Sequence, residues 1–383
     1  MIHNNEYLPN LTPLRGIAAL LVAIFHFEMA AGRFVPAQTT MFFEKCYLMV
    51  DLFFVLSGFI MMHVYSKAFS ITIQKTSFKQ FLVARFARIY PLHFFSLLFL
   101  ILFVKFLPHA DLQYKNVESP SSILNNFLLL HSFYLNKIYT WNIPSWSISA
   151  EWWCYLIFPL IALFMNKKKM VAIILLLLFI IGSYYSIMYL LPRVNPLYPA
   201  APVPHNINST YDYGFLRGIA GFTLGMIMYA AYQMPAVKKF LQIDFFVLII
   251  MLLLTATLHF AGNDSICVIL FAMIVPAFAA NNGFVHRVCN NKALQYIGNI
   301  SYSIYLMQIF LQVPFSHGLR LPGVTGLGRG KLNIAFFPGL RYCCLYIIFL
   351  ILISSLTYYV IEKPCRRFIN RLASKSSTQL EVA

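Results

Sequence analysis

Long apolar segments recur along this 383-residue chain, and they restrict its fold more than any other feature of the sequence. Several approach or exceed the length of about 20 residues that an α-helix needs to cross about 30 Å of hydrocarbon. The composition agrees, because 60% of the residues are hydrophobic and only 11% are charged, whereas soluble domains contain about 25% charged residues. We therefore predict an all-α polytopic membrane protein with about ten transmembrane helices. These spans are expected at about residues 11–31, 49–66, 89–107, 147–165, 170–191, 213–232, 244–261, 265–281, 298–316 and 339–361.

The distribution of basic residues predicts how these spans are oriented. An even number of spans places both termini on one side of the membrane. If that side is the cytoplasm, the inner segments hold most of the 29 Lys and Arg residues, as the positive-inside rule requires. We therefore predict cytoplasmic termini, a single transmembrane domain over residues 1–368 and a polar cytoplasmic tail over residues 369–383. The net charge of +17 then reflects cytoplasmic loops and membrane lipid rather than a nucleic-acid partner.

Two ionisable residues, Arg15 and His26, lie inside the first apolar segment. Ionisable side chains are costly in hydrocarbon and by default indicate function. Their spacing of eleven residues is about three helical turns, so both side chains face the same way, about 16 Å apart along the axis. A neutral imidazole suits proton transfer near neutral pH. The alternatives are a packing histidine and an ordinary basic helix end. The pair predicts a track along which a charged substrate presents its reactive end inside the membrane.

Further polar residues near the span ends are candidates for the same site. Arg85 and Arg88 are three residues apart and share a helical face, so they form either a phosphate clamp or ordinary positive-inside flanks. Asp51 lies at the start of the second span, and Glu151 lies at the outer end of the fourth. Either carboxylate orients His26, holds substrate hydroxyls, or belongs to an interfacial aromatic belt. The histidines and cysteines show no metal-ligand spacing, so no metal is expected.

Five motifs occur in a fixed order along the chain. They are Leu14-Arg15-Gly16 with His26, Asp51-x-Phe53-Phe54-x-Leu56-Ser57-Gly58-Phe59, Arg85-x-x-Arg88-Ile89-x-Pro91, Trp146-Ser147-x-Ser149-x-Glu151 and Ser301-Tyr302-Ser303-x-Tyr305-Leu306. In this order they resemble acyltransferase family 3, the integral-membrane acyltransferases that O-acetylate bacterial surface polysaccharides. The resemblance covers about residues 11–368.

The resemblance implies a ten-span O-acyltransferase of the bacterial inner (cytoplasmic) membrane. Such an enzyme takes acyl-CoA, by default acetyl-CoA, from the cytoplasm. It acylates a hydroxyl of an extracytoplasmic carbohydrate, such as lipopolysaccharide O-antigen, capsule or exopolysaccharide. By the same resemblance, Arg15 and His26 form the principal catalytic pair, and Arg85 and Arg88 stand at the acyl-CoA entrance. We expect Arg15 to steady the donor as well, and Glu151 or Asp51 to orient His26.

Two positions depart from the family pattern. Gln308 stands where the family usually shows a histidine, so no acid/base role carries over to it, and Trp152 follows Glu151 where a second acid is common. Apart from the resemblance, the spans and intramembrane charges fit equally well a transporter or flippase of a glycan or lipid-linked sugar that transfers no acyl group. The sequence shows none of the internal repeats that are typical of transporters.

Overall fold

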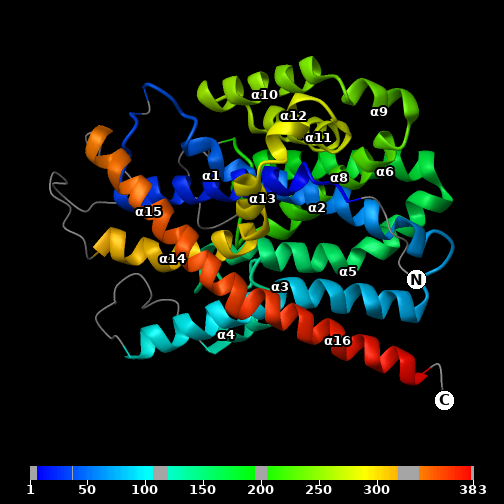
Figure 1. Ribbon diagram of the computed structural model, residues 1–383, viewed down its shortest axis with the longest axis horizontal. Helices are drawn as coiled ribbons and strands as arrows, with labels where there is room; N and C mark the ends of the chain where they lie inside the picture. The colour runs from blue at the N-terminus through cyan, green and yellow to red at the C-terminus, as the bar shows by residue number, and fades with distance from the viewer. Residues whose placement is uncertain (1–6, 37, 107–119, 195–204, 318–335, 381–383) are drawn as a thin grey trace. The chain divides into compact units, whose positions relative to one another are not determined.

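The computed structural model of the protein describes residues 7–36, 38–106, 120–194, 205–317 and 336–380 (Figure 1). These residues form helices and no β-strand. Seven of the described helices are long and apolar enough to cross a membrane, an eighth span arises if the bent pair α9 and α10 counts as one, and two further apolar helices are shorter. The prediction of an all-helical polytopic membrane protein is therefore confirmed.

The chain divides into two compact units, which we describe separately. Unit 1 comprises Met1–Asn5, Ile60–Met226 and Thr357–Ala383, and unit 2 comprises Glu6–Phe59 and Ile227–Leu356. The helices of unit 2, some of which end beyond it, are α1 (Leu11–Ala31), η1 (Glu44–Leu48), α2 (Met49–Tyr65), α9 (Pro235–Leu241), α10 (Asp244–His259), α11 (Asp264–Ala280), α12 (Phe284–Cys289), α13 (Lys292–Asn299), α14 (Ser301–His317) and α15 (Phe336–Thr357). Those of unit 1 are η2 (Ser66–Phe69), α3 (Lys75–Phe106), α4 (Pro120–Phe127), η3 (Ile143–Ser145), α5 (Trp146–Lys167), α6 (Lys169–Tyr185), η4 (Ser186–Leu190), α7 (Leu191–Val194), α8 (Gly214–Tyr232), η5 (Tyr358–Glu362) and α16 (Lys363–Leu380).

Helix α1 is the axis of unit 2, and α13 and α14 pack against it. At its first turn, the Asn10 side chain donates to the backbone carbonyls of Phe278 and Asn281, both at 2.8 Å, at the end of α11. Beyond its last turn, the backbone amide of Met41 donates to the carbonyl of His259 over 3.1 Å. The two ends of α1 are thus tied to opposite ends of the α10–α11 pair.

The backbones of α1 and α13 approach each other closely at two glycines. A Cβ atom added to Gly298 would lie 2.1 Å from the carbonyl oxygen of Thr12, and one added to Gly16 would lie 2.7 Å from the backbone nitrogen of Gly298. Real side chains do not tolerate such distances to backbone atoms. The glycine that follows Arg15 is therefore explained by helix packing.

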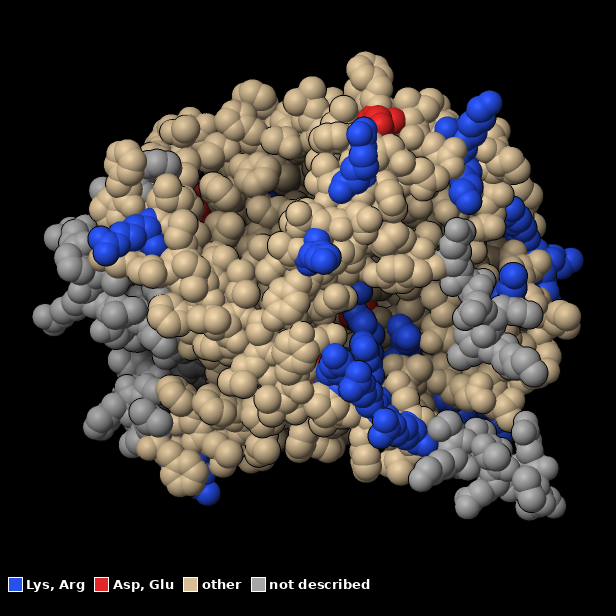
Figure 2. Space-filling view, in the orientation of Figure 1, with Lys and Arg blue, Asp and Glu red and all other residues tan. Residues whose placement is uncertain are grey.

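Unit 1 is built around α3, which packs against α5 and α16 (Figure 1). The third span was expected at about 89–107, but the helix begins at Lys75. Arg85 and Arg88 consequently lie within a continuous helix, more than two turns from its start. Figure 2 shows basic side chains along the surface that α16 occupies in Figure 1. Helix α16 continues to Leu380, so the polar tail predicted from residue 369 is helical over most of its length.

Candidate active site

The imidazole of His26 is held by Gln308 on α14. His26 Nδ1 lies 3.1 Å from Gln308 Oε1, and the ring is only partly buried. Gln308 is fully buried, and its Nε2 donates to the carbonyl of Tyr305 over 2.8 Å. Because a carbonyl can only accept, the amide nitrogen must face Tyr305 and the amide oxygen must face His26. His26 therefore donates through Nδ1.

This arrangement selects one tautomer of neutral His26. With the proton on Nδ1, the ring offers Nε2 as its proton acceptor. The group that orients the imidazole is thus a neutral amide, where triads use a carboxylate. Sequence reasoning noticed Gln308 only as a departure from the family pattern, because the contact joins residues 282 positions apart.

Arg15, like His26, contacts helix α14. Its Nη2 donates to the Ser301 hydroxyl over 3.3 Å, at the first residue of α14. Since Arg15 meets Ser301 and His26 meets Gln308, α1 and α14 run side by side in the same direction. The prediction that Arg15 and His26 share one face of α1 agrees with this geometry.

The two candidate carboxylates fall in different units. Asp51 is fully buried in the first turn of α2 in unit 2, within electrostatic reach of Cys267 on α11. Glu151 belongs to α5 in unit 1, where it accepts a short hydrogen bond from the Tyr155 hydroxyl one turn later. Tyr155, like Glu151, belongs to unit 1.

The guanidinium of Arg85 lies between two tyrosine rings of unit 1. Its Cζ is 5.3 Å from the centre of the Tyr65 ring and 5.9 Å from that of Tyr155, and Nη2 donates to the Tyr65 hydroxyl over 3.1 Å. Arg85, Arg88 and Glu151 all act electrostatically on the Tyr155 hydroxyl. Glu151 and Arg85 thus both contact the Tyr155 side chain. Tyr155 was missed, although its spacing of four residues from Glu151 predicts contact on a helix.

Arg85 has a further N–H group that can donate a hydrogen bond to a ligand. Within the described part of the chain, its buried Nε has no hydrogen-bond partner. A buried N–H without an acceptor is costly, so an acceptor supplied by a ligand would be stabilised there. The hydrogen bond to Tyr65 and the two nearby rings hold the guanidinium, whose planar fork suits the binding of a phosphate group.

Two histidines that the sequence leaves scattered are stacked in unit 1. The rings of His93 and His131 are parallel, with centroids 5.7 Å apart. His93 Nε2 lies 3.0 Å from the carbonyl of Asn126, and His131 Nε2 lies 3.0 Å from the Ser145 hydroxyl. Both side chains are buried. Over the described residues, no group of three or more His, Cys, Asp or Glu could hold a metal ion.

The buried His131, in the segment between α4 and η3, makes the stability of the protein depend on pH. Burial, with the nearby His93 as a second cause, lowers its pKa from 6.5 to about 3. Between pH 3 and 6.5 the folded protein binds fewer protons than the unfolded chain. The stabilising contribution of neutral His131 to the free energy of unfolding is therefore complete above pH 6.5 and is lost as the pH falls toward 3. We expect Tm to fall on acidification across this window, and His131→Gln to make the fall shallower. The matched variant His205→Gln, at an exposed histidine, should keep the wild-type slope; the same slope in His131→Gln would contradict the assignment.

Comparison with known proteins gives one consistent family. A family model described as an acyltransferase domain matches residues 9–359. The peptidoglycan O-acetyltransferase OatA of Listeria monocytogenes is 23% identical over 396 aligned residues, which cover 96% of this chain and 57% of that protein. The acyltransferase MdmB of Streptomyces mycarofaciens is 25% identical, with 95% of this chain and 93% of that protein covered. The chain therefore spans little more than half of the Listeria protein. No solved structure matches the chain.

Proposed function

Because this chain belongs to acyltransferase family 3, whose domain covers residues 9–359, we propose that it transfers an acyl group, by default acetyl, from cytoplasmic acyl-CoA to a carbohydrate hydroxyl outside the bacterial inner membrane. The observation that carries the proposal is the seam between α1 and α14. Along it, a cation and an imidazole of fixed tautomer contact one neighbouring helix, about 16 Å apart. This is the arrangement that a donor with an anionic end and a distant reactive end requires.

The helices support the ten-span topology on which this direction of transfer depends. We propose ten spans, made up of the seven helices that are long and apolar enough among the described residues, the bent pair and the two shorter apolar helices. In that order α1 is the first span and α14 is the ninth, so the alternation of spans requires them to run in the same direction. Their two polar contacts meet this requirement. The positive-inside rule then places both termini in the cytoplasm.

The donor is proposed to bind through the arginine pair of α3. The nucleotide end of acetyl-CoA carries several phosphate charges, and Arg85 and Arg88 offer guanidinium forks for them. Tyr65, Tyr155 and Glu151 keep the Arg85 fork in place. Glu151, which accepts from Tyr155, is proposed to support this donor site, and its expected role in orienting His26 or holding substrate hydroxyls stays a proposal. Arg15, at the inner end of α1, steadies the phosphates or the entering pantetheine arm.

His26 is proposed to act on the acceptor through Nε2. As the sugar oxygen attacks the thioester carbonyl, Nε2 takes the hydroxyl proton, the C–O bond forms, and the C–S bond breaks. The proton then passes to the departing CoA thiolate, so no charge is left on the ring. The alternative path, in which Nε2 itself carries the acyl group before the sugar attacks, uses the same tautomer. Asp51, in the same unit as His26, remains the candidate carboxylate for imidazole orientation or substrate hydroxyls.

The decisive experiment separates acyl transfer from transport. Proteoliposomes that contain the protein are given acetyl-CoA labelled in the acetyl group, together with surface glycan whose ester groups have been removed by mild alkali. An acyltransferase leaves covalent label on the glycan, and mild alkali releases it again as acetate. A transporter or flippase moves glycan across the bilayer and leaves it unlabelled, and that result would overturn the proposal.

Substitution of Arg85 by lysine tests the donor clamp. Arg85→Lys keeps the charge but loses the planar fork, so we expect the KM for acetyl-CoA to rise about tenfold while kcat stays within about twofold. Steady-state kinetics over a range of acetyl-CoA concentrations measure both values. Arg287→Lys is the matched control, because Arg287 is exposed on α12 and its charge acts on Asp244. An unchanged KM in Arg85→Lys would count against the clamp.

A further inference from the structure

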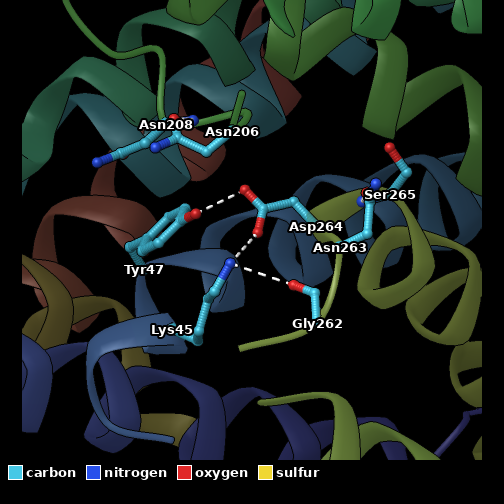
Figure 3. Close-up of polar contacts among 8 residues, drawn as sticks. All are labelled: Lys45, Tyr47, Asn206, Asn208, Gly262, Asn263, Asp264 and Ser265. Carbon is cyan, nitrogen blue, oxygen red and sulfur yellow. Dashed lines mark hydrogen bonds and ion pairs between the residues drawn. The ribbon is translucent and has the colours of Figure 1, made fainter. Parts of the chain in front are cut away.

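A second polar cluster lies in unit 2, at the end of α1 that is far from Arg15. Asp264 opens α11 and is almost fully buried. Its Oδ1 is 2.6 Å from Lys45 Nζ, and its Oδ2 accepts from the Tyr47 hydroxyl at 2.6 Å. Lys45 Nζ also donates to the carbonyl of Gly262 over 3.2 Å. Figure 3 shows the Lys45 ammonium and the Tyr47 hydroxyl reaching the two oxygens of the same carboxylate.

Aromatic rings connect this cluster to His26. The Tyr47 ring lies 6.0 Å from that of Phe25, and the Phe25 ring lies 5.0 Å from the imidazole of His26. Lys45 and Tyr47 both belong to η1, which packs against α1 and α11. The cluster is thus linked to the imidazole through one intervening ring, that of Phe25, which lies ten residues beyond Arg15 on α1.

We propose that Lys45, Tyr47, Asp264 and Phe25 form a binding subsite for an uncharged, hydroxyl-rich sugar unit of the acceptor. This inference rests on the proposed function, because it assigns the acceptor side of the same reaction. A sugar needs hydrogen-bond donors for its hydroxyl oxygens and an apolar face for its C–H groups. The cluster supplies a donor in the Lys45 ammonium, an acceptor in the Tyr47 phenol oxygen, whose own O–H is donated to Asp264, and the partly exposed aromatic side chains of Phe25 and Tyr47.

Lys45 has hydrogen-bonding capacity left for a ligand. An ammonium carries three N–H groups, and Asp264 and Gly262 account for two of them. The Lys45 side chain retains 16% of its accessible surface, whereas Asp264 retains 1%. Lys45, the more accessible member of the pair, therefore keeps one N–H that neither Asp264 nor Gly262 accepts, and Asp264 holds Lys45 and Tyr47 in place.

Charge decides which kind of sugar fits. Asp264 neutralises Lys45, so the subsite has no net charge to attract a carboxylate or phosphate. The adjoining charges lead to the same conclusion, because Arg33 is paired with Glu44 at 2.7 Å and the carboxyl of Glu28 is buried beside them. An anionic sugar would meet acidic groups with no cation to spare, whereas a neutral sugar unit meets neither attraction nor repulsion.

The first test separates acceptor binding from donor binding. Tyr47→Phe removes one hydroxyl and keeps the ring, and we expect it to raise the KM for the de-esterified glycan about tenfold, the loss of one well-placed hydrogen bond. The KM for acetyl-CoA should stay within about twofold. Tyr296→Phe is the matched control, because its hydroxyl donates to Ser355 over 2.6 Å elsewhere in unit 2. A Tyr47→Phe protein with unchanged glycan KM, or with both KM values raised alike, would overturn the subsite.

The second test addresses charge. Methyl glucoside and methyl glucuronoside compete with the glycan in the same labelled assay, and wild-type protein should be inhibited at lower concentration by the neutral glycoside. Asp264→Asn leaves the Lys45 charge uncompensated, so the order of the two inhibitors should reverse. An order that is the same in both proteins, or no inhibition by either glycoside, refutes recognition of a neutral sugar here. Failure of the proposed function looks different, since wild-type protein would then place no label on the glycan at all.

Discussion

Replacement of His26 by alanine is expected to lower kcat for acyl transfer by roughly 10²–10⁴-fold, the usual contribution of a positioned general base. The ring is the group at the end of the α1–α14 seam that can accept a proton, and Gln308 cannot replace it because an amide does not titrate. The measurement is turnover of labelled acetyl-CoA by protein shown to be folded and inserted. Near-wild-type turnover in His26→Ala would end the proposed mechanism.

The partner of His26 offers a finer control on the same prediction. Gln308→Leu keeps a side chain of similar size but removes the acceptor at 3.1 Å from Nδ1, so the imidazole loses its fixed tautomer and kcat should fall with little change in either KM. Gln308→Glu restores an acceptor of the kind that triads use. It should recover activity and move the pH–rate profile upward, because a carboxylate favours the protonated ring. Equal losses in both variants would show that Gln308 only fills space.

Replacement of Gly298 by alanine is expected to reduce the amount of folded protein and to lower its Tm by roughly 2–12 °C. The added methyl group would meet the carbonyl oxygen of Thr12 at 2.1 Å, so α1 and α13 must separate. Overpacking costs about 1–3 kcal/mol, and each kcal/mol is worth roughly 2–4 °C in a chain of 150–250 residues. Detergent-solubilised yield and thermal unfolding followed by intrinsic fluorescence measure the effect.

Another helical glycine provides the matched comparison. Gly182 is exposed on α6, and an added Cβ there would have nothing within 4 Å. Gly182→Ala should therefore leave Tm unchanged or raise it slightly, since alanine favours a helix over glycine by about 1 kcal/mol. If Gly298→Ala were as stable as Gly182→Ala, the close approach of α1 and α13 would not exist in the folded protein.

Local periodicity accounts for what the sequence could predict. The helical repeat alone places Arg15 and His26 on one face of α1, and both side chains do contact α14. Apolar length likewise predicts the membrane helices and misses mainly their ends. The expected span at 89–107 covers only the later part of α3. The segment from Lys75 to Arg88 carries several basic residues, yet it forms the first turns of the same helix.

Contacts between distant segments could not be predicted in the same way. Glu151 is an ionisable residue in apolar surroundings, and the sequence does not say which groups its carboxylate meets. The structure records its contact with Tyr155, beside Arg85. The Lys45–Asp264 pair joins residues 219 positions apart and belongs to no motif. Such pairings follow from how helices pack, and hydropathy carries no information about them.

Helix α1 has a consequence for the choice of donor. It runs unbroken from Leu11 to Ala31, and its first turns are wedged against α13 at Gly16 and Gly298. Arg15 and His26 therefore lie on one continuous helix, and their separation along its axis is fixed. On the proposed donor path, an arm shortened by one peptide-like unit would not bring the thioester to the imidazole, so the fixed spacing would select the donor by length as well as by charge.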